Sequence, residues 1–270
     1  MAAVPVARFV SAASPYRIVR STSTAADFHG RIVPDPARCE LWQHDIASPA
    51  LVLGSTQDES VVDLDACGRA GVEVVRRRSG GGAVLLLPGE VTWIDVIVPA
   101  GTPGWSDDVH GQMVWLGRHL AAAISAVGGA RHDVVVHDGA LRATAWSSLV
   151  CFDGLGAGEV LLDGHKLVGI SQRRTRHAAR LQCCWYSAYD LGRLVELLVP
   201  DRRPPTTALA PVATLPAALS DATVAALTAS LNNSAALDVR RHGFRTVSDT
   251  KPRIADSVDD TNSECLTREQ

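Results

Sequence analysis

A run of arginines that leads directly into a run of glycines is the strongest constraint on this 270-residue chain. Residues 74–84 read Val-Val-Arg-Arg-Arg-Ser-Gly-Gly-Gly-Ala-Val, so a β-branched strand enters the glycines and an apolar segment leaves them. Consecutive glycines allow positive φ and close approach of backbone N–H groups to an anion, and arginines add planar, permanently charged donors. The stretch predicts a phosphate- or carboxylate-binding loop; the plainer interpretation is a surface turn flanked by solvated arginines.

A second stretch, residues 159–174, predicts a β-hairpin. Two apolar runs meet at Asp163-Gly164, and Asp-Gly between such runs is typical of a two-residue turn in which both central positions take positive φ. Lys166 is therefore expected just past the tip, at the start of the returning strand. The chain contains only one other lysine, Lys251, although it is rich in arginine. A compact ammonium group kept at this place suits a position between two oxyanions.

Together the two stretches resemble the lipoate-protein ligase family. The family shares its catalytic fold with biotin-protein ligases and octanoyltransferases, so the resemblance implies an α+β domain with a mostly antiparallel sheet flanked by helices, related to class II aminoacyl-tRNA synthetases. One departure is that Leu85-Leu86 follow Val84, where the family usually has an aromatic residue and a histidine. The residues that carry the resemblance span roughly positions 40 to 190 and are Leu41-Trp42, residues 50–57, Arg77-x-Ser79-Gly80-Gly81-Gly82-Ala83-Val84 and Asp163-Gly164-x-Lys166-x-Val168-Gly169-x-Ser171-Gln172-Arg173-Arg174.

The order of apolar segments favours the same fold class. Strand-like runs outnumber helical ones, and most connections look like hairpins, including one in which residues 83–87 pair with residues 90–99 across Pro88-Gly89. The best helix is expected from about Ser106 to Gly128-Gly129. A chain of this length suits a single catalytic domain. We predict a partly helical N-terminal segment (1–38), a ligase-like catalytic domain (39–200), a linker with a short helix (201–232) and a disordered tail (233–270).

The resemblance also implies an activity and its site. In this hypothesis lipoate or octanoate attacks the α-phosphate of Mg²⁺-bound ATP, and the acyl-adenylate then passes its acyl group to a lysine of a lipoyl-acceptor domain of a 2-oxoacid dehydrogenase complex or of the glycine cleavage H protein. Lys166 would be the catalytic residue. Arg173 and Arg174 would form a phosphate or acceptor rim, with a solvated face as the plainer alternative. The residues implied in binding ATP and the acyl-adenylate are Arg77, Ser79, Gly80, Gly81, Gly82, Ala83 and Gly169.

Cys151 supports an alternative hypothesis. It follows an apolar strand and precedes the glycine-rich connection to Lys166, the region in which some octanoyltransferases place a cysteine nucleophile. Neighbouring lysine and arginine would favour the reactive thiolate, whereas a buried and inert cysteine is the plainer interpretation. The chain would then be an ATP-independent octanoyltransferase. A third possibility is a non-catalytic relative that binds an acyl group or a partner.

Composition limits the classes of partner that the protein can bind and the cellular compartment in which we expect it. A net charge of −3 argues against general binding to nucleic acid or to anionic membranes. Six cysteines without a C-x-x-C pair predict neither a disulfide framework nor a protein-bound metal site. No apolar run approaches the ~18 residues of a membrane span, so we predict a cytoplasmic protein. Three arginines before the first acid, Asp27, leave an organellar transit peptide within residues 1–26 open.

Overall fold

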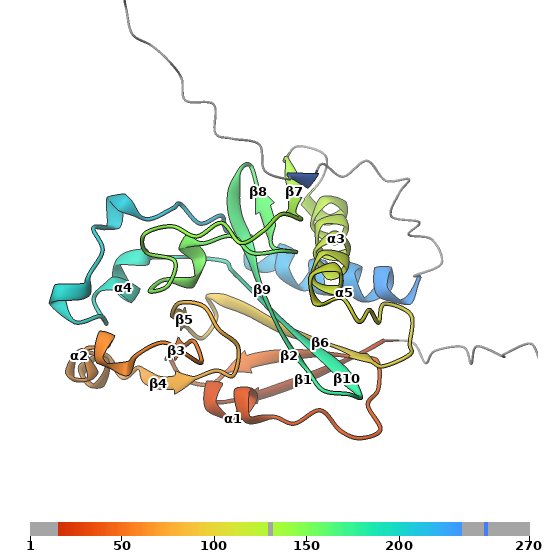
Figure 1. The fold of residues 1–270 in the computed structure, drawn as a ribbon, viewed down its shortest axis with the longest axis horizontal. Coiled ribbons are helices and arrows are strands. Elements are labelled where there is room, and N and C mark those ends of the chain that lie inside the picture. Colours follow the sequence, from red (N-terminus) through yellow and green to blue (C-terminus); the bar gives the residue numbers. More distant parts are fainter. Residues whose placement is uncertain (1–15, 129–131, 234–245, 248–270) are drawn as a thin grey trace, which may run out of the picture.

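The computed structural model describes residues 16–128, 132–233 and 246–247, which fold into two β-sheets and their covering helices (Figure 1). The larger sheet has the strand order β1-β2-β6-β10-β9-β8-β7-β11 and the smaller one the order β4-β3-β5. The strands are β1 (Arg17–Ser23), β2 (Glu40–Ile46), β3 (Ala50–Leu53), β4 (Glu73–Arg76), β5 (Val84–Leu86), β6 (Val91–Pro99), β7 (Val134–His137), β8 (Val160–Leu162), β9 (His165–Arg174), β10 (Ala178–Tyr186) and β11 (Thr246–Val247).

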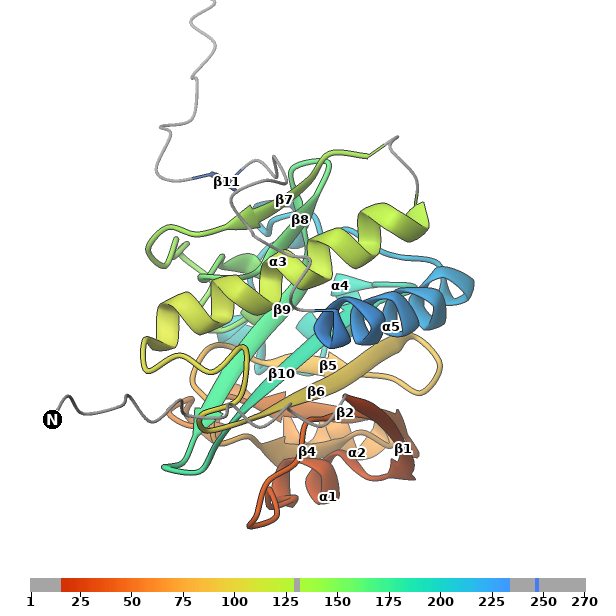
Figure 2. The same ribbon diagram turned by 90° about the vertical axis from the view of Figure 1, so that its right-hand side faces the viewer.

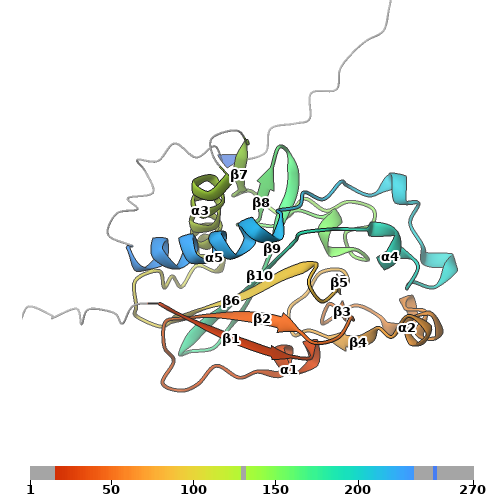
Figure 3. The same cartoon turned by 180° about the vertical axis from the view of Figure 1, so that it is seen from behind.

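Four of the five described α-helices fall into two groups. Figure 2 shows α3 and α5 side by side across one face of the large sheet, and Figures 1 and 3 place α2 and α4 beside the small sheet. Within the described ranges, no helix is both long enough and apolar enough to cross a membrane. The helices are α1 (Ala25–Gly30), α2 (Leu64–Ala70), α3 (Val109–Gly128), α4 (Leu191–Val195) and α5 (Ala217–Asn232).

Strand pairing agrees with the predicted fold class. The central run of the large sheet, from β2 through β6, β10, β9 and β8 to β7, is antiparallel throughout. Among the strands that the structure describes, the parallel pairs are β1–β2, β3–β4 and β7–β11. The Asp163-Gly164 turn between β8 and β9 has φ of 51° and 84°, as the Asp-Gly pattern predicts. Lys166 is accordingly the second residue of β9.

One predicted hairpin is wrong. The strand before Pro88-Gly89, β5, pairs with β3, whereas the strand after it, β6, pairs with β2 and β10 in the other sheet. Both strands are buried along almost their whole length, so neither shows the alternation that would specify a partner for one face. The turn therefore carries the chain from one sheet to the other, and the two sheets meet around the segment that follows the glycines.

The longest helix, α3, begins at Val109 rather than near Ser106, because Asp108 accepts hydrogen bonds from the backbone of His110 (3.0 Å) and Gly111 (3.0 Å) and so caps it. Helix α5 packs against α3 and adds Val224 and Leu227 to the main core. Apart from Asn233 and residues 246–247, the predicted tail lies outside the described residues, as do residues 1–15 of the possible transit peptide.

The first described residue, Tyr16, meets the end of the last described helix, α5. The Tyr16 backbone N–H donates to Asn232 Oδ1 (2.5 Å), and Asn232 Nδ2 donates to the Tyr16 carbonyl (3.1 Å). Asn232 is the last residue of α5, and Tyr16 directly precedes β1. Strand β1 is thereby tied both to β2 and to the helical layer.

A buried charged cluster holds α1 against the large sheet. Asp95 is fully buried and accepts hydrogen bonds from His44 Nε2 (2.9 Å) and Arg180 Nε (2.8 Å). Burial alone would raise the pKa of Asp95, but His44 and Arg180 outweigh it and lower that pKa below its usual value. Arg180 also donates to the carbonyls of Phe28 (2.6 Å) and Arg31 (2.7 Å). Removing the guanidinium would leave a buried carboxylate underpaired, so the cluster ties α1 to β10.

Candidate active site

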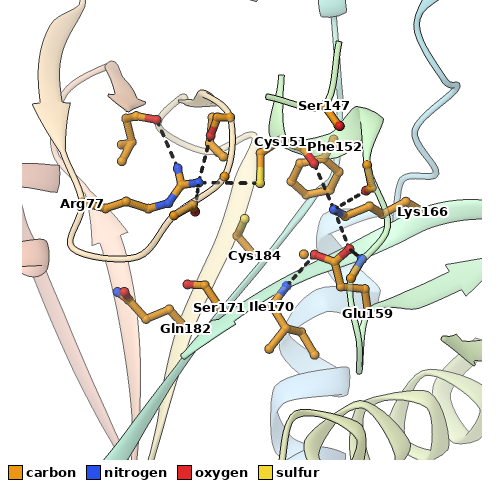
Figure 4. Close-up of a pocket in the computed structure, with 18 of the residues that line it drawn as sticks. Arg77, Ser147, Cys151, Phe152, Glu159, Lys166, Ile170, Ser171, Gln182 and Cys184 are labelled. Atoms are coloured by element: carbon orange, nitrogen blue, oxygen red, sulfur yellow. Dashed lines mark hydrogen bonds and ion pairs between the residues drawn. The ribbon is translucent and has the colours of Figure 1, made fainter. Parts of the chain in front are cut away.

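A pocket of about 450 Å³ lies between the glycine loop (residues 79–82, which lie between β4 and β5), strands β9 and β10 of the large sheet, and residues 147–156 (Figure 4). Its volume is in the range of small-molecule sites. Much of the wall is apolar, which suits an acyl chain, and charged groups enter it at only a few points. The apolar part of the lining includes Val52, Val84, Leu86, Trp93, Phe152 and Ile170.

Arg77 holds the glycine loop from the inside. Its side chain is 6% exposed, and Nη2 donates to the carbonyls of Gly80 (2.8 Å) and Gly82 (2.9 Å). Nη1 donates to the carbonyl of Val52 at 3.3 Å. The guanidinium therefore binds the backbone of its own loop, with the Gly80 and Gly82 carbonyls turned toward it. In this arrangement Arg77 contributes positive charge to the pocket while most of its donors are occupied.

Two of the glycines are required for different reasons. Gly81 has a φ of +98°, which disfavours any residue with a side chain. A Cβ at Gly82 would lie 2.6 Å from the backbone nitrogen of Val150, inside contact distance of the segment that leads into Cys151. At Gly80, by contrast, a Cβ would meet nothing within 4 Å. The Gly-Gly-Gly sequence is typical of anion-binding loops, but at Gly82 the close approach of the Val150 backbone is by itself a sufficient reason for glycine.

We expect Gly82→Ala to destabilise the fold by about 1–3 kcal/mol and to displace the segment that carries Cys151, because neither backbone can move aside cheaply. The matched variant Gly80→Ala should change the free energy of unfolding by less than about 0.5 kcal/mol. Urea unfolding monitored by tryptophan fluorescence measures both. Similar unfolding midpoints for the two variants would mean that the contact at Gly82 is unimportant.

Lys166 is buried, and its ammonium group lies among three protein oxygens. Nζ lies 2.7 Å from Glu159 Oε2 and donates to the carbonyls of Cys151 (3.1 Å) and Gly154 (2.9 Å), as the dashed lines in Figure 4 indicate. Burial works to lower the pKa of Lys166, but the charges of Glu159 and Cys151 outweigh it and raise that pKa overall. The lysine therefore stays charged, and it fixes the turn that carries Cys151.

Glu159 completes this arrangement and was not assigned a role from the sequence. It is 5% exposed and accepts hydrogen bonds from the backbone of Gly156 (2.7 Å) and Ile170 (3.2 Å), in addition to pairing with Lys166. A buried carboxylate needs such partners. The signal that could have found it is its position as the only acid at the start of an otherwise apolar run, seven residues before the lysine.

The Cys151 thiol opens into the pocket. The residue starts a short 3₁₀ helix (Cys151–Asp153), and its backbone N–H donates to the carbonyl of Ala83 (3.0 Å) directly after the glycines. Its Sγ lies 3.8 Å from Arg77 Nη2, and its carbonyl is bound by Lys166. A second pocket cysteine, Cys184, has its pKa raised to about 12, by burial first and then by Cys151. Cys184 thus stays a neutral thiol, although the charges of Lys166 and Arg77 act to lower its pKa.

The structure gathers most of the residues expected at the site. Ser79 lies at the edge, with its Oγ 3.2 Å from that of Ser171, and Ala83 is buried beneath the loop. Arg174 turns away, because its guanidinium lies 4.3 Å from the centre of the Trp105 ring and donates to the Ser106 carbonyl. Within the described ranges, no three histidine, cysteine or acidic side chains are grouped to hold a metal. The expected residues that line the pocket are Arg77, Gly80, Gly81, Gly82, Cys151, Lys166 and Gly169.

Comparison with known proteins identifies the class. Residues 28–235 match the lipoyl protein ligase A/B catalytic domain. The chain therefore belongs to the lipoyl protein ligase A/B family, whose members are acyl-transferring enzymes, and the resemblance drawn from the sequence is confirmed.

Individual relatives refine this assignment. Over 146 residues the chain is 34% identical to the octanoyltransferase LipM of Kyrpidia tusciae; the match covers 53% of this chain and about half (51%) of that protein. A lipoate-protein ligase A solved with ATP has a TM-score of 0.56 at 19% identity, covering 88% of this chain and 90% of the other. A bipartite lipoate protein ligase from Thermoplasma acidophilum, studied with its E2 lipoyl domain, has a TM-score of 0.53 at 17% identity, covering 88% of each chain. The two structures confirm the predicted α+β fold.

Proposed function

We propose that this protein transfers an octanoyl group, or a close relative of it, from a thioester donor to a lysine of a lipoyl-acceptor domain, with Cys151 as the covalent carrier. The observation that carries the proposal is a thiol opening into an apolar pocket with Arg77 Nη2 3.8 Å from its sulfur. A cation in contact with the sulfur can stabilise the negative charge that develops there when the sulfur is displaced from the thioester. The 34% identity to an octanoyltransferase supports the same choice.

The reaction has two steps. In the first, the Cys151 thiol loses its proton as its sulfur attacks the acyl carbonyl, a new carbon–sulfur bond forms, the bond to the donor sulfur breaks, and the donor leaves as a thiol by taking up the proton that Cys151 released. In the second, the neutral amine of the acceptor lysine attacks the enzyme thioester. An amide bond forms, and the proton released by the amine returns to the Cys151 sulfur. Neither step consumes ATP.

Lys166 and Glu159 serve in this proposal as positioning residues. The ammonium binds the Cys151 and Gly154 carbonyls on the two sides of the 3₁₀ turn, and Glu159 keeps the ammonium in place. A turn fixed at both ends holds the nucleophile within the small tolerance that catalysis requires. The apolar wall would take the acyl chain.

For the acceptor we propose the lipoyl domains of 2-oxoacid dehydrogenase complexes, with the glycine cleavage H protein as the other candidate. The similar T. acidophilum ligase was studied together with an E2 lipoyl domain. Such an acceptor offers a lysine on a protein surface, which agrees with a pocket whose lining includes the exposed residues Gly80 and Leu141.

A second candidate is ATP-dependent ligation through an acyl-adenylate, favoured by the Arg77 to Ala83 loop and by the similarity to an ATP-bound ligase fold. It would require lipoate or octanoate, ATP and Mg²⁺. The residues fit this less well: Lys166 Nζ already donates to two carbonyls and forms an ion pair with Glu159, and Arg77 is bound to its own loop. Both cations would have to exchange their partners for phosphate.

One experiment separates the candidates. We expect the purified chain, incubated with octanoyl-carrier protein and no ATP, to gain a hydroxylamine-labile octanoyl group on Cys151, detected by mass spectrometry of peptides. Addition of a lipoyl domain should then discharge it. Pyrophosphate release that depends on free octanoate or lipoate, with no adduct on Cys151, would instead establish the ligase. Binding of acyl donors with neither reaction would indicate a non-catalytic relative.

A further inference from the structure

A polar track runs from the pocket along strands β9 and β10. Alternate residues of a strand share one face, and residues paired across strands lie side by side on it. Three successive pairs on the pocket face are Gly169 with Cys184, Ser171 with Gln182, and Arg173 with Arg180. The first two pairs line the pocket, so Arg173 lies on the same face, one step further out. From Gly169 to Arg173 the strand advances by about 13 Å.

Most arginines near this track are held by the protein itself. Arg76 donates to the carbonyls of Gly54 and Gln57, and Arg174 and Arg180 have the partners described above. In the part of the chain that the structure describes, the side chains of Arg78 and Arg173 make neither a hydrogen bond nor an ion pair. Their positive charges are therefore available to a ligand.

Arg78 and Arg173 lie at the same end of the track. Arg78 directly precedes Ser79, whose Oγ is 3.2 Å from that of Ser171, two residues before Arg173. The pKa of Arg173 is lowered, by partial burial first and then by the nearby charge of Arg78. Two uncompensated cations this close together favour a doubly contacted anion such as a phosphate.

Between the cysteine and the arginines lies an unused donor. The amide nitrogen of Gln182 is buried and finds no hydrogen-bond partner among the described residues. A buried donor left unpaired costs free energy, so a ligand carbonyl at this point would be favoured. The track thus offers, in order, a thiol, an amide donor and a pair of cations.

We propose that this track binds the phosphopantetheine arm of the acyl donor, with Gln182 donating to an amide carbonyl of the arm and Arg78 and Arg173 holding its phosphate. The proposal rests on thioester transfer through Cys151. The lengths agree: about thirteen covalent bonds separate the sulfur of the arm from its phosphorus, as many as in about four extended residues, or ~14 Å. Arg78 and Arg173 would then be specificity-determining residues for the donor.

The test compares two donors that differ only in the phosphate, octanoyl-pantetheine and octanoyl-4′-phosphopantetheine. We expect kcat/KM for acylation of Cys151 to be about tenfold higher with the phosphorylated donor, a typical effect of a charge-assisted hydrogen bond. Arg173→Gln and Arg78→Gln should each remove most of that preference while leaving the rate with octanoyl-pantetheine unchanged. Arg69→Gln, an exposed arginine on α2, is the matched control and should keep the preference.

Three outcomes have distinct meanings. Equal rates with the two donors, or variants that slow both donors alike, would overturn the phosphate site while leaving acyl transfer intact. If neither donor acylates Cys151, the proposed function itself is overturned, and the arm site with it. Octanoyl-coenzyme A and octanoyl-carrier protein carry the same arm. The donor whose advantage in kcat/KM over octanoyl-pantetheine is abolished by Arg173→Gln is the source that the site accepts.

Discussion

Replacing Cys151 with alanine should lower the rate of octanoyl transfer to an acceptor lysine by at least about a thousandfold, because the covalent intermediate can no longer form. Stability should change far less. Loss of one partly buried sulfur atom costs on the order of 1 kcal/mol. The transfer rate, followed by mass spectrometry of the acceptor, and the free energy of unfolding in urea together measure both effects.

Cys67→Ala provides the control for this variant. Cys67 is buried in α2, in the cluster that packs around the small sheet, and lies outside the pocket lining, so its loss should affect stability without affecting the chemistry. If Cys151→Ala keeps near-normal transfer, the sulfur is not the carrier. The ligase route would then become the better account of the pocket.

The second large effect concerns the buried pair of Lys166 and Glu159. Lys166→Met should destabilise the fold by about 3–5 kcal/mol, because it leaves the carboxylate of Glu159 buried without its countercharge. Acyl transfer should be lost as well, because the turn that carries Cys151 loses two hydrogen bonds. Urea unfolding gives the first quantity and the acylation rate of Cys151 the second.

A double variant separates charge from position. Lys166→Met combined with Glu159→Gln should regain much of the stability, since no buried charge remains and glutamine can still accept from the Gly156 backbone, yet it should not regain activity. Lys166→Arg keeps the charge but cannot place a forked guanidinium among three oxygens set for an ammonium. Wild-type stability of Lys166→Met would show that the pair contributes little.

The sequence predicts the local geometry of this site better than its contacts. The Asp163-Gly164 turn and the placement of Lys166 on the returning strand follow from residue types alone, because the backbone conformation that the turn needs is available to few residues. The pairing of β5 could not be predicted in the same way. A three-residue strand buried throughout carries no pattern that selects its neighbour.

The role of Arg77 shows a second limit. Its charge beside three glycines is visible in the sequence, and the hypothesis of an anion-binding loop followed from it. Whether those glycines turn their N–H groups toward a bound anion or their carbonyls toward the guanidinium depends on peptide orientation, which residue types do not specify. Glu159 was missed for a related reason: its ion pair with Lys166 depends on how the hairpin of β8 and β9 between them places the two side chains, and the register of that hairpin shifts between Val160 and Leu161.

The hydrogen bonds between Tyr16 and Asn232 join residues 216 positions apart, and Arg180 reaches back across 152 positions to the carbonyl of Phe28. Such distant contacts slow folding, because a long loop must close before either contact stabilises anything. During synthesis, strand β1 and helix α1 leave the ribosome long before β10 and α5 exist. The N-terminal elements β1 and α1 therefore cannot form these stabilising contacts until almost the whole domain has been synthesised.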